Sequence, residues 1–126
     1  MDRKLLQQRT KQFHIDVIKL CELLPRNAAG FEIAKQIIRS AGSVGANYRS
    51  SMRAKSTKDF IYKIELVLEE ADESHSWLEI IRDADLINGE YIERLTKEAN
   101  ELTAIFAATD KTAKANNSKN IDRTRK

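Results

Sequence analysis

The sequence predicts an all-α protein, an antiparallel up-down-up-down four-helix bundle followed by a disordered basic C-terminal tail. Proline occurs once and glycine four times in 126 residues, so few residues that interrupt helices are present. Four segments repeat apolar residues at the three- and four-residue spacing of an amphipathic helix. Only short connections separate these segments, and short connections make consecutive helices antiparallel neighbours.

The first helix is expected over residues 5–24. Proline cannot continue the backbone hydrogen-bond ladder, so Pro25 marks the end of this helix, and residues 26–30 form the connection. The apolar stripe that should face the core consists of Leu6, Phe13, Val17, Leu20 and Leu24.

The second helix is expected over residues 31–54. Gly42 and Gly45 lie inside it, and each costs about 1 kcal/mol of helix propensity relative to alanine. Glycine inside a helix often marks a place where another backbone or a ligand comes close. The predicted core stripe is Ile33 or Ala34, Ile37, Ala41, Val44, Tyr48 and Met52.

The third helix is expected over residues 58–82, with Ser56 or Thr57 as its cap and Asp59 in its first turn. Its apolar residues again alternate in steps of three and four. The predicted core stripe is Ile61, Ile64, Leu68, Ala71, His75 and Leu78, flanked by Phe60, Val67 and Ile81.

A turn over residues 83–89 should follow, with the Asn88-Gly89 pair as its strongest signal. The fourth helix begins near Glu90. Its predicted core stripe is Ile92, Leu95, Ala99, Leu102 and either Ile105 or Phe106.

From Ala113 onwards the apolar pattern stops, and the remaining residues are polar and basic, which is typical of disordered chain. We therefore divide the sequence into a four-helix bundle over residues 1–112 and a disordered basic tail over residues 113–126.

The composition argues against several classes of protein. No segment approaches the roughly 18 apolar residues of a membrane-spanning helix. Residues 1–8 carry charges but no apolar stretch of the kind that a signal peptide needs. Cys21 is the single cysteine, so no internal disulfide can form. We expect a cytoplasmic protein that does not contact a membrane.

Charge is strongly segregated along the chain, although the formal net charge is only +3. Residues 1–63 hold 13 Lys and Arg against 5 Asp and Glu, and residues 64–110 hold 3 against 13. Residues 111–126 are basic again, with 6 against 1. Segregation of this kind favours association with a charged partner or with other copies of the chain.

The second helix carries a basic strip. Six residues fall within about 40° of one line along this helix, with basic side chains at both ends and small residues in the middle. Cations at this spacing could contact a phosphate backbone, and the small residues would equally admit an acidic helix. The alternative is an ordinary solvated face. The strip consists of Lys35, Arg39, Gly42, Ala46, Arg49 and Arg53, whose four cations are the candidate nucleic-acid-binding residues.

The third helix has a second apolar patch on the side opposite its core stripe, bordered by acidic residues. Large apolar residues outside a monomer's core tend to mark an interface, and Trp and Tyr are enriched in interfaces. The alternative is that the helix is rotated and Trp77 belongs to the core. The candidate oligomer interface is Tyr62, Leu66, Glu70, Glu73, Trp77 and Ile80.

The sequence contains no recognisable active site. Asp72 and His75 give one partial match to the Glu-x-x-His motif of di-iron bundles, which need two such motifs, and the only other histidine is His14. Cys21 lies inside a helical apolar pattern, where a thiol is usually inert. We therefore expect no catalytic residues, no metal or other cofactor, and no small-molecule substrate.

The stretch Arg-Ser-Ala-Gly-Ser-Val-Gly-Ala-Asn-Tyr-Arg over residues 39–49 resembles the 23S rRNA intervening-sequence proteins, a family of four-helix bundles. Further segments resemble the same family in the same order, so that the resemblance spans about residues 5–112. They are residues 9–13, 59–64, 70–78 and 98–106.

The resemblance implies a bundle that assembles as a homopentamer and has no established enzymatic activity. Some members are encoded within insertions of large-subunit ribosomal RNA genes. A more distant relative is the accessory protein of diversity-generating retroelements, a basic ring thought to hold nucleic acid. This chain departs from many members at Ser50, where they have Glu, and at Glu69, where they have Lys.

Two hypotheses about function follow. The first is a non-catalytic homo-oligomer that binds RNA or DNA through Lys35, Arg39, Arg49 and Arg53, with the basic tail contributing. In the second, the basic strip forms the subunit interface of an assembly scaffold that interacts with proteins. There Arg39, Arg49 and Arg53 would pair with Glu69, Glu70 or Glu73 of a neighbouring copy.

Overall fold

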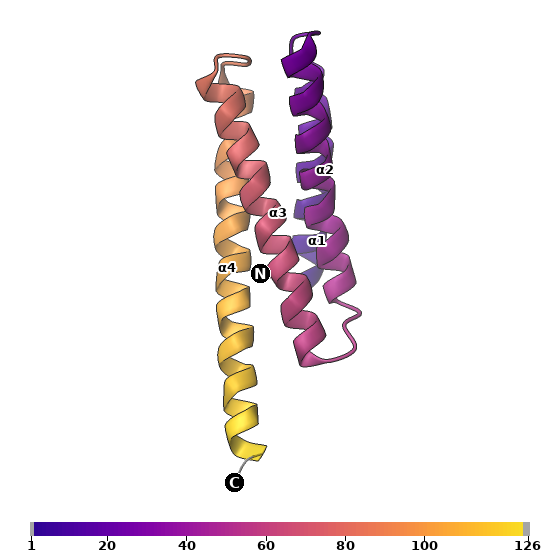
Figure 1. The fold of residues 1–126 in the computed structure, drawn as a ribbon, viewed down its shortest axis with the longest axis vertical. Coiled ribbons are helices and arrows are strands. Elements are labelled where there is room, and N and C mark those ends of the chain that lie inside the picture. Colours follow the sequence, from indigo (N-terminus) through magenta and orange to yellow (C-terminus); the bar gives the residue numbers. More distant parts are fainter. Residues whose placement is uncertain (1, 125–126) are drawn as a thin grey trace.

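The computed structural model describes residues 2–124, with side chains through residue 120. This part of the chain folds into four helices, which run alternately up and down (Figure 1). Each helix packs against the next, and α1 also packs against α4, so that the four helices surround one core. The predicted all-α, up-down-up-down bundle is confirmed. The helices are α1 (Arg3–Cys21), α2 (Ala28–Ser51), α3 (Thr57–Asp83) and α4 (Glu90–Thr124).

The first three helices begin at a polar side chain that accepts a hydrogen bond from the backbone N–H three residues ahead. The caps are Asp2, Asn27 and Ser56, with donor–acceptor distances of 2.8, 2.9 and 3.0 Å. Such caps satisfy amide groups that have no partner inside the helix. Ser56, rather than Thr57, therefore caps α3.

Two helices end earlier than the sequence predicted. The regular part of α1 stops at Cys21 and that of α2 at Ser51, three residues before the expected ends at 24 and 54. Beyond both points the backbone continues in tighter turns, in which each N–H bonds to the carbonyl three residues back. Arg53 consequently lies in the α2–α3 connection and not on the helix.

The core contains the predicted apolar stripes of α1 and α4, with Phe106 rather than Ile105 fully buried. Of the predicted α2 stripe the middle is buried, whereas Ile33, Ala34 and Met52 at its ends are half-buried and pack against the core.

The stripe of α3 is rotated from the predicted one. Ser74 is completely buried where His75 was expected, and His75 lies near the surface beside Glu79. The buried residues of α3 are Ile64, Val67, Ala71, Ser74, Leu78 and Ile81.

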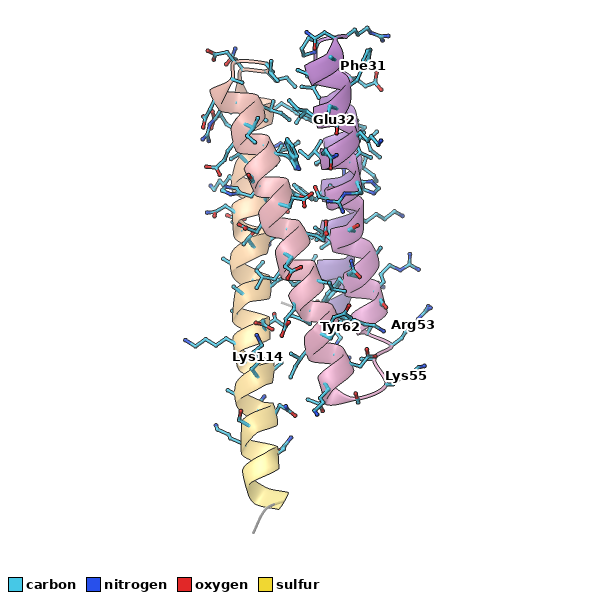
Figure 2. All side chains as sticks on the ribbon, viewed as in Figure 1. Phe31, Glu32, Arg53, Lys55, Tyr62 and Lys114 are labelled. Carbon is cyan, nitrogen blue, oxygen red and sulfur yellow. The ribbon has the colours of Figure 1, made fainter. Side chains whose placement is uncertain are left out.

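The expectation of disorder from residue 113 is corrected, because α4 continues as a helix to Thr124. It extends past the α2–α3 connection (Figure 1). Lys114, which is labelled in Figure 2, forms ion pairs with Asp110 on its own helix, at 2.9 Å, and with Glu65 on α3, at 3.2 Å. No Gly or Pro follows Gly89, so nothing in the local sequence stops a helix that the core has already nucleated.

None of the four described helices is long and apolar enough to span a bilayer.

Candidate nucleic-acid interface

The candidate nucleic-acid-binding residues are all exposed to solvent, and we call them the basic face. They are Lys35, Arg39 and Arg49 on α2, and Arg53 just beyond its end. Arg53 projects from the α2–α3 connection together with Lys55, which widens the charged surface at that end of the bundle (Figure 2).

Arg39 differs from the other members of the basic face because it is already paired. Its guanidinium donates to the Glu70 carboxylate on α3 at 3.1 Å and also to Glu73. The negative charge of Glu70, with that of Glu73, raises the pKa of Arg39. The structure thus joins a residue predicted to bind nucleic acid to two residues predicted to form an oligomer interface. The middle of the basic face is partly neutralised.

Lys35, Arg49 and Arg53 form no ion pair with any described residue. In contrast, Arg9 on α1 and Arg94 on α4 are paired with carboxylates across the α1–α4 boundary. Arg9 donates to Glu98 at 2.7 and 2.6 Å and to Glu101 at 2.6 Å. Arg94 lies 3.5 Å from Asp16. Positive charge that is not compensated within the described chain therefore gathers at both ends of the basic face.

Gly42 allows α1 to approach α2 closely, whereas Gly45 faces α1 at an ordinary contact distance. A Cβ atom on Gly42 would lie 3.0 Å from the imidazole of His14, and one on Gly45 would lie 3.4 Å from Thr10 Oγ1. The sequence predicted such an approach by a backbone or a ligand, and the structure shows that side chains of α1 make it. Side chains of α1 therefore lie beside the two glycines, which do not form an empty surface between the cations.

A groove of about 520 Å³ follows this contact on the solvent side, and we call it the α1–α2 groove. The α1 residues that line it were missed by the sequence analysis, which considered only one helix at a time. The two glycines were the available signal, since they marked where a second element lies. The groove is lined by Gln7, Gln8, Thr10, Lys11 and His14 from α1, and by Gly42, Gly45, Ala46 and Arg49 from α2.

The candidate oligomer interface on α3 is only partly exposed. Tyr62 is 59% exposed and Ile80 is 42% exposed, whereas Leu66 and Trp77 are half-buried. Trp77 packs against the core cluster, so it contributes to the fold as well as to the surface. The remaining apolar surface is widest at the two ends of the patch.

The described residues contain no cluster of three His, Cys, Asp or Glu side chains that could hold a metal ion. Cys21 is half-buried, and burial raises the pKa of its thiol to about 11, with the charge of Glu22 adding to the effect. A thiol with so high a pKa is a poor nucleophile near neutral pH.

Comparison with known proteins connects this bundle to one family. The family model described as 23S rRNA-intervening sequence protein matches residues 4–108. A crystal structure from Bacteroides thetaiotaomicron, described as a protein with unknown function from the S23 ribosomal protein family, is 30% identical with a TM-score of 0.76. The match covers 83% of this chain and 97% of that chain. No curated protein gives a significant match.

Proposed function

The chain belongs to the 23S rRNA-intervening sequence protein family, and from this premise we propose that it is a non-catalytic, homo-oligomeric module that binds RNA or DNA through its basic face. The observation that carries the proposal is the state of Lys35, Arg49 and Arg53. All three are exposed and unpaired among the described residues. Cations in this state can neutralise phosphates without first breaking an ion pair.

The proposed oligomer would form through the outer face of α3, where Tyr62 and Ile80 expose apolar surface. Burying such residues against another copy removes apolar area from water, which is the main favourable contribution to association. A pentamer is the subunit number that the family resemblance suggests. Repeating the basic face around a ring would multiply the number of phosphate contacts that one assembly makes.

Filter binding of a single-stranded RNA over a salt series tests the proposal. On a single strand, three unpaired cations for each bound subunit correspond to a slope of about −2.1 in log K against log salt. The triple variant Lys35→Gln/Arg49→Gln/Arg53→Gln should lose both the affinity and the slope. A matched control is Lys19→Gln/Lys97→Gln/Lys111→Gln, which removes the same charge elsewhere on the surface. Binding that ignores salt, or that survives the triple variant, overturns the proposal.

A second candidate function is an assembly scaffold in which the basic face itself forms the subunit interface. The observation that favours it is Glu69 on α3, which is exposed and unpaired among the residues with described side chains. Glu69 could therefore accept a hydrogen bond from Arg49 or Arg53 of another copy. The pairing of Arg39 with Glu70 and Glu73 inside one chain supports the first candidate instead, because those carboxylates are already engaged.

Light scattering after size-exclusion chromatography separates the two candidates. If the basic face binds nucleic acid, Arg49→Glu should keep the oligomer and lose RNA binding. If the basic face is the interface, the same variant should dissociate the oligomer, because it places two carboxylates opposite each other. The reverse variant, Glu69→Arg, should then restore assembly when it is combined with Arg49→Glu.

A further inference from the structure

We propose that the α1–α2 groove binds one nucleotide of a single-stranded nucleic acid, with the phosphate at Lys11 and Arg49 and the base at His14, Gln7 and Gln8. This inference rests on the proposed function and makes it more specific. It adds four residues of α1 to the site, and it names a single strand rather than a duplex as the ligand.

The phosphate end of the groove is defined by two cations from different helices. Lys11 on α1 and Arg49 on α2 both line the groove, both are exposed, and neither pairs with a described carboxylate. No Asp or Glu lines the groove. A single phosphodiester between two such cations would gain charge-assisted hydrogen bonds with no acidic neighbour to oppose them.

The base end of the groove offers one flat ring and two free amides. The His14 imidazole is half-buried and lies beside Gly42, so one aromatic ring forms part of the wall of the groove. The side-chain amides of Gln7 and Gln8 make no hydrogen bond with a described residue. Proteins bind unstacked bases by stacking on aromatic rings, including histidine, and by hydrogen bonds to the base edges.

The shape of the groove selects for a single strand. A duplex is read by an element that protrudes into one of its grooves, whereas the α1–α2 groove is a hollow between two packed helices. The volume of about 520 Å³ lies within the range of about 300–1,000 Å³ found for small-ligand sites.

The larger groove between α1 and α4, about 680 Å³, makes a useful comparison. Its lining includes Arg9 and Arg94, but also the carboxylates of Asp16, Glu98 and Glu101 that pair with them. A phosphate that bound Arg9 or Arg94 there would have to displace a carboxylate, and one that bound the third cation of the lining, Lys97, would still face three acidic residues. Volume alone therefore does not identify the site, and the difference lies in the uncompensated charge.

Fluorescence anisotropy with a labelled single-stranded RNA, and with the same sequence as a blunt duplex, tests the inference on the full chain. The single strand should bind at least about five-fold more tightly, since one stacked base contributes about that much. The double variant Lys11→Gln/Arg49→Gln should abolish this preference and reduce the salt slope on the single strand by about 1.4. The control Lys35→Gln/Arg53→Gln removes the same charge outside the groove and should retain the preference.

The outcomes separate this inference from the proposed function. The groove is not the site if the wild type binds single-stranded and duplex RNA equally well. The same holds if both double variants still prefer the single strand. In either case the proposed function stands. If the wild type binds no nucleic acid at any salt concentration, both the function and the inference are overturned.

The two histidines provide a second readout that needs no variant. His14 lies in the groove, and His75 lies outside it on α3, beside Glu79. In an NMR titration with adenosine monophosphate, the imidazole signals of His14 should shift while those of His75 stay in place. Equal shifts of both histidines, or none at His14, would count against the groove.

Discussion

Ser40 on α2 and Ser74 on α3 place their hydroxyl oxygens 2.9 Å apart in the interior of the bundle, and both residues are completely buried. Each hydroxyl also lies within hydrogen-bond distance of a carbonyl in its own helix, Ile37 for Ser40 at 3.2 Å and Glu70 for Ser74 at 2.8 Å. Two small polar side chains thus fill the space between the helices without leaving a buried hydroxyl unsatisfied.

Replacing either serine by alanine should therefore cost little stability. We expect Ser40→Ala and Ser74→Ala each to lower the free energy of unfolding by about 1 kcal/mol. The double variant should lose less stability than the two single variants added together, because each single variant already breaks the hydrogen bond that the two serines share. Urea denaturation measures all three, with the exposed Ser76→Ala as the control. Strict additivity would show that the two hydroxyls do not interact.

Gly30 and Gly45 should respond in opposite ways to the same substitution. A Cβ atom on Gly30 would lie 1.8 Å from the Pro25 carbonyl oxygen, so Gly30→Ala forces the α1–α2 connection to move. We expect a loss of at least about 2 kcal/mol in the free energy of unfolding. At Gly45 the nearest atom is 3.4 Å away, and Gly45→Ala should stabilise α2 by up to about 1 kcal/mol. Thermal unfolding followed by circular dichroism distinguishes the two.

Arg39 should contribute less to nucleic-acid binding than Arg49. Arg39 must leave Glu70 and Glu73 before it can bind a phosphate, whereas Arg49 has no described partner to leave. We expect Arg49→Gln to weaken RNA binding about five-fold or more and Arg39→Gln to weaken it by less than half as much. Parallel titrations at one salt concentration provide the comparison. A larger loss at Arg39 would mean that its two ion pairs open readily in the complex.

Cys21 should resist alkylation in the folded protein. Its pKa of about 11 leaves very little thiolate at pH 8, because burial disfavours the charged form. Iodoacetamide should therefore react about a hundred-fold more slowly with the native chain than with the urea-unfolded chain, whose thiol has a pKa near 8.5. The native rate should rise as the pH approaches 11. Equal rates in both states would show that the helix end at Cys21 opens frequently.

The sequence was sufficient to predict four helices because the apolar spacing, one proline and the cap at Ser56 or Thr57 indicate where they lie, although the ends of α1 and α2 were placed three residues late. It did not predict the rotation of α3, since Ser74 is buried for its small size and its bond to Ser40. A hydrophobicity pattern cannot reveal either property. The continuation of α4 was missed for a related reason. Residues after 113 lack an apolar stripe, yet they propagate a helix whose stability comes from the packed part.

The candidate site was less predictable than the fold. Exposure of Lys35, Arg49 and Arg53 follows from their charge, but the pairing of Arg39 depends on how α3 is rotated against α2. The contribution of Lys11 and His14 depends on which helix lies beside Gly42. Both relationships join residues that are distant in the sequence, and no spacing within one helix encodes them.

The length of α4 makes the two ends of the bundle unlike. At about 1.5 Å per residue, the helix over residues 113–124 is about 17 Å long, and its last part extends past the α2–α3 connection at one end of the bundle (Figure 1). In a ring with cyclic symmetry every copy points the same way, so these projections would form a basic fringe on one side only. Dihedral symmetry would place a fringe on both sides. Side views in electron microscopy would therefore distinguish cyclic from dihedral symmetry without a count of the subunits. A fringe on one side only would also let a long polyanion approach the ring from a single direction.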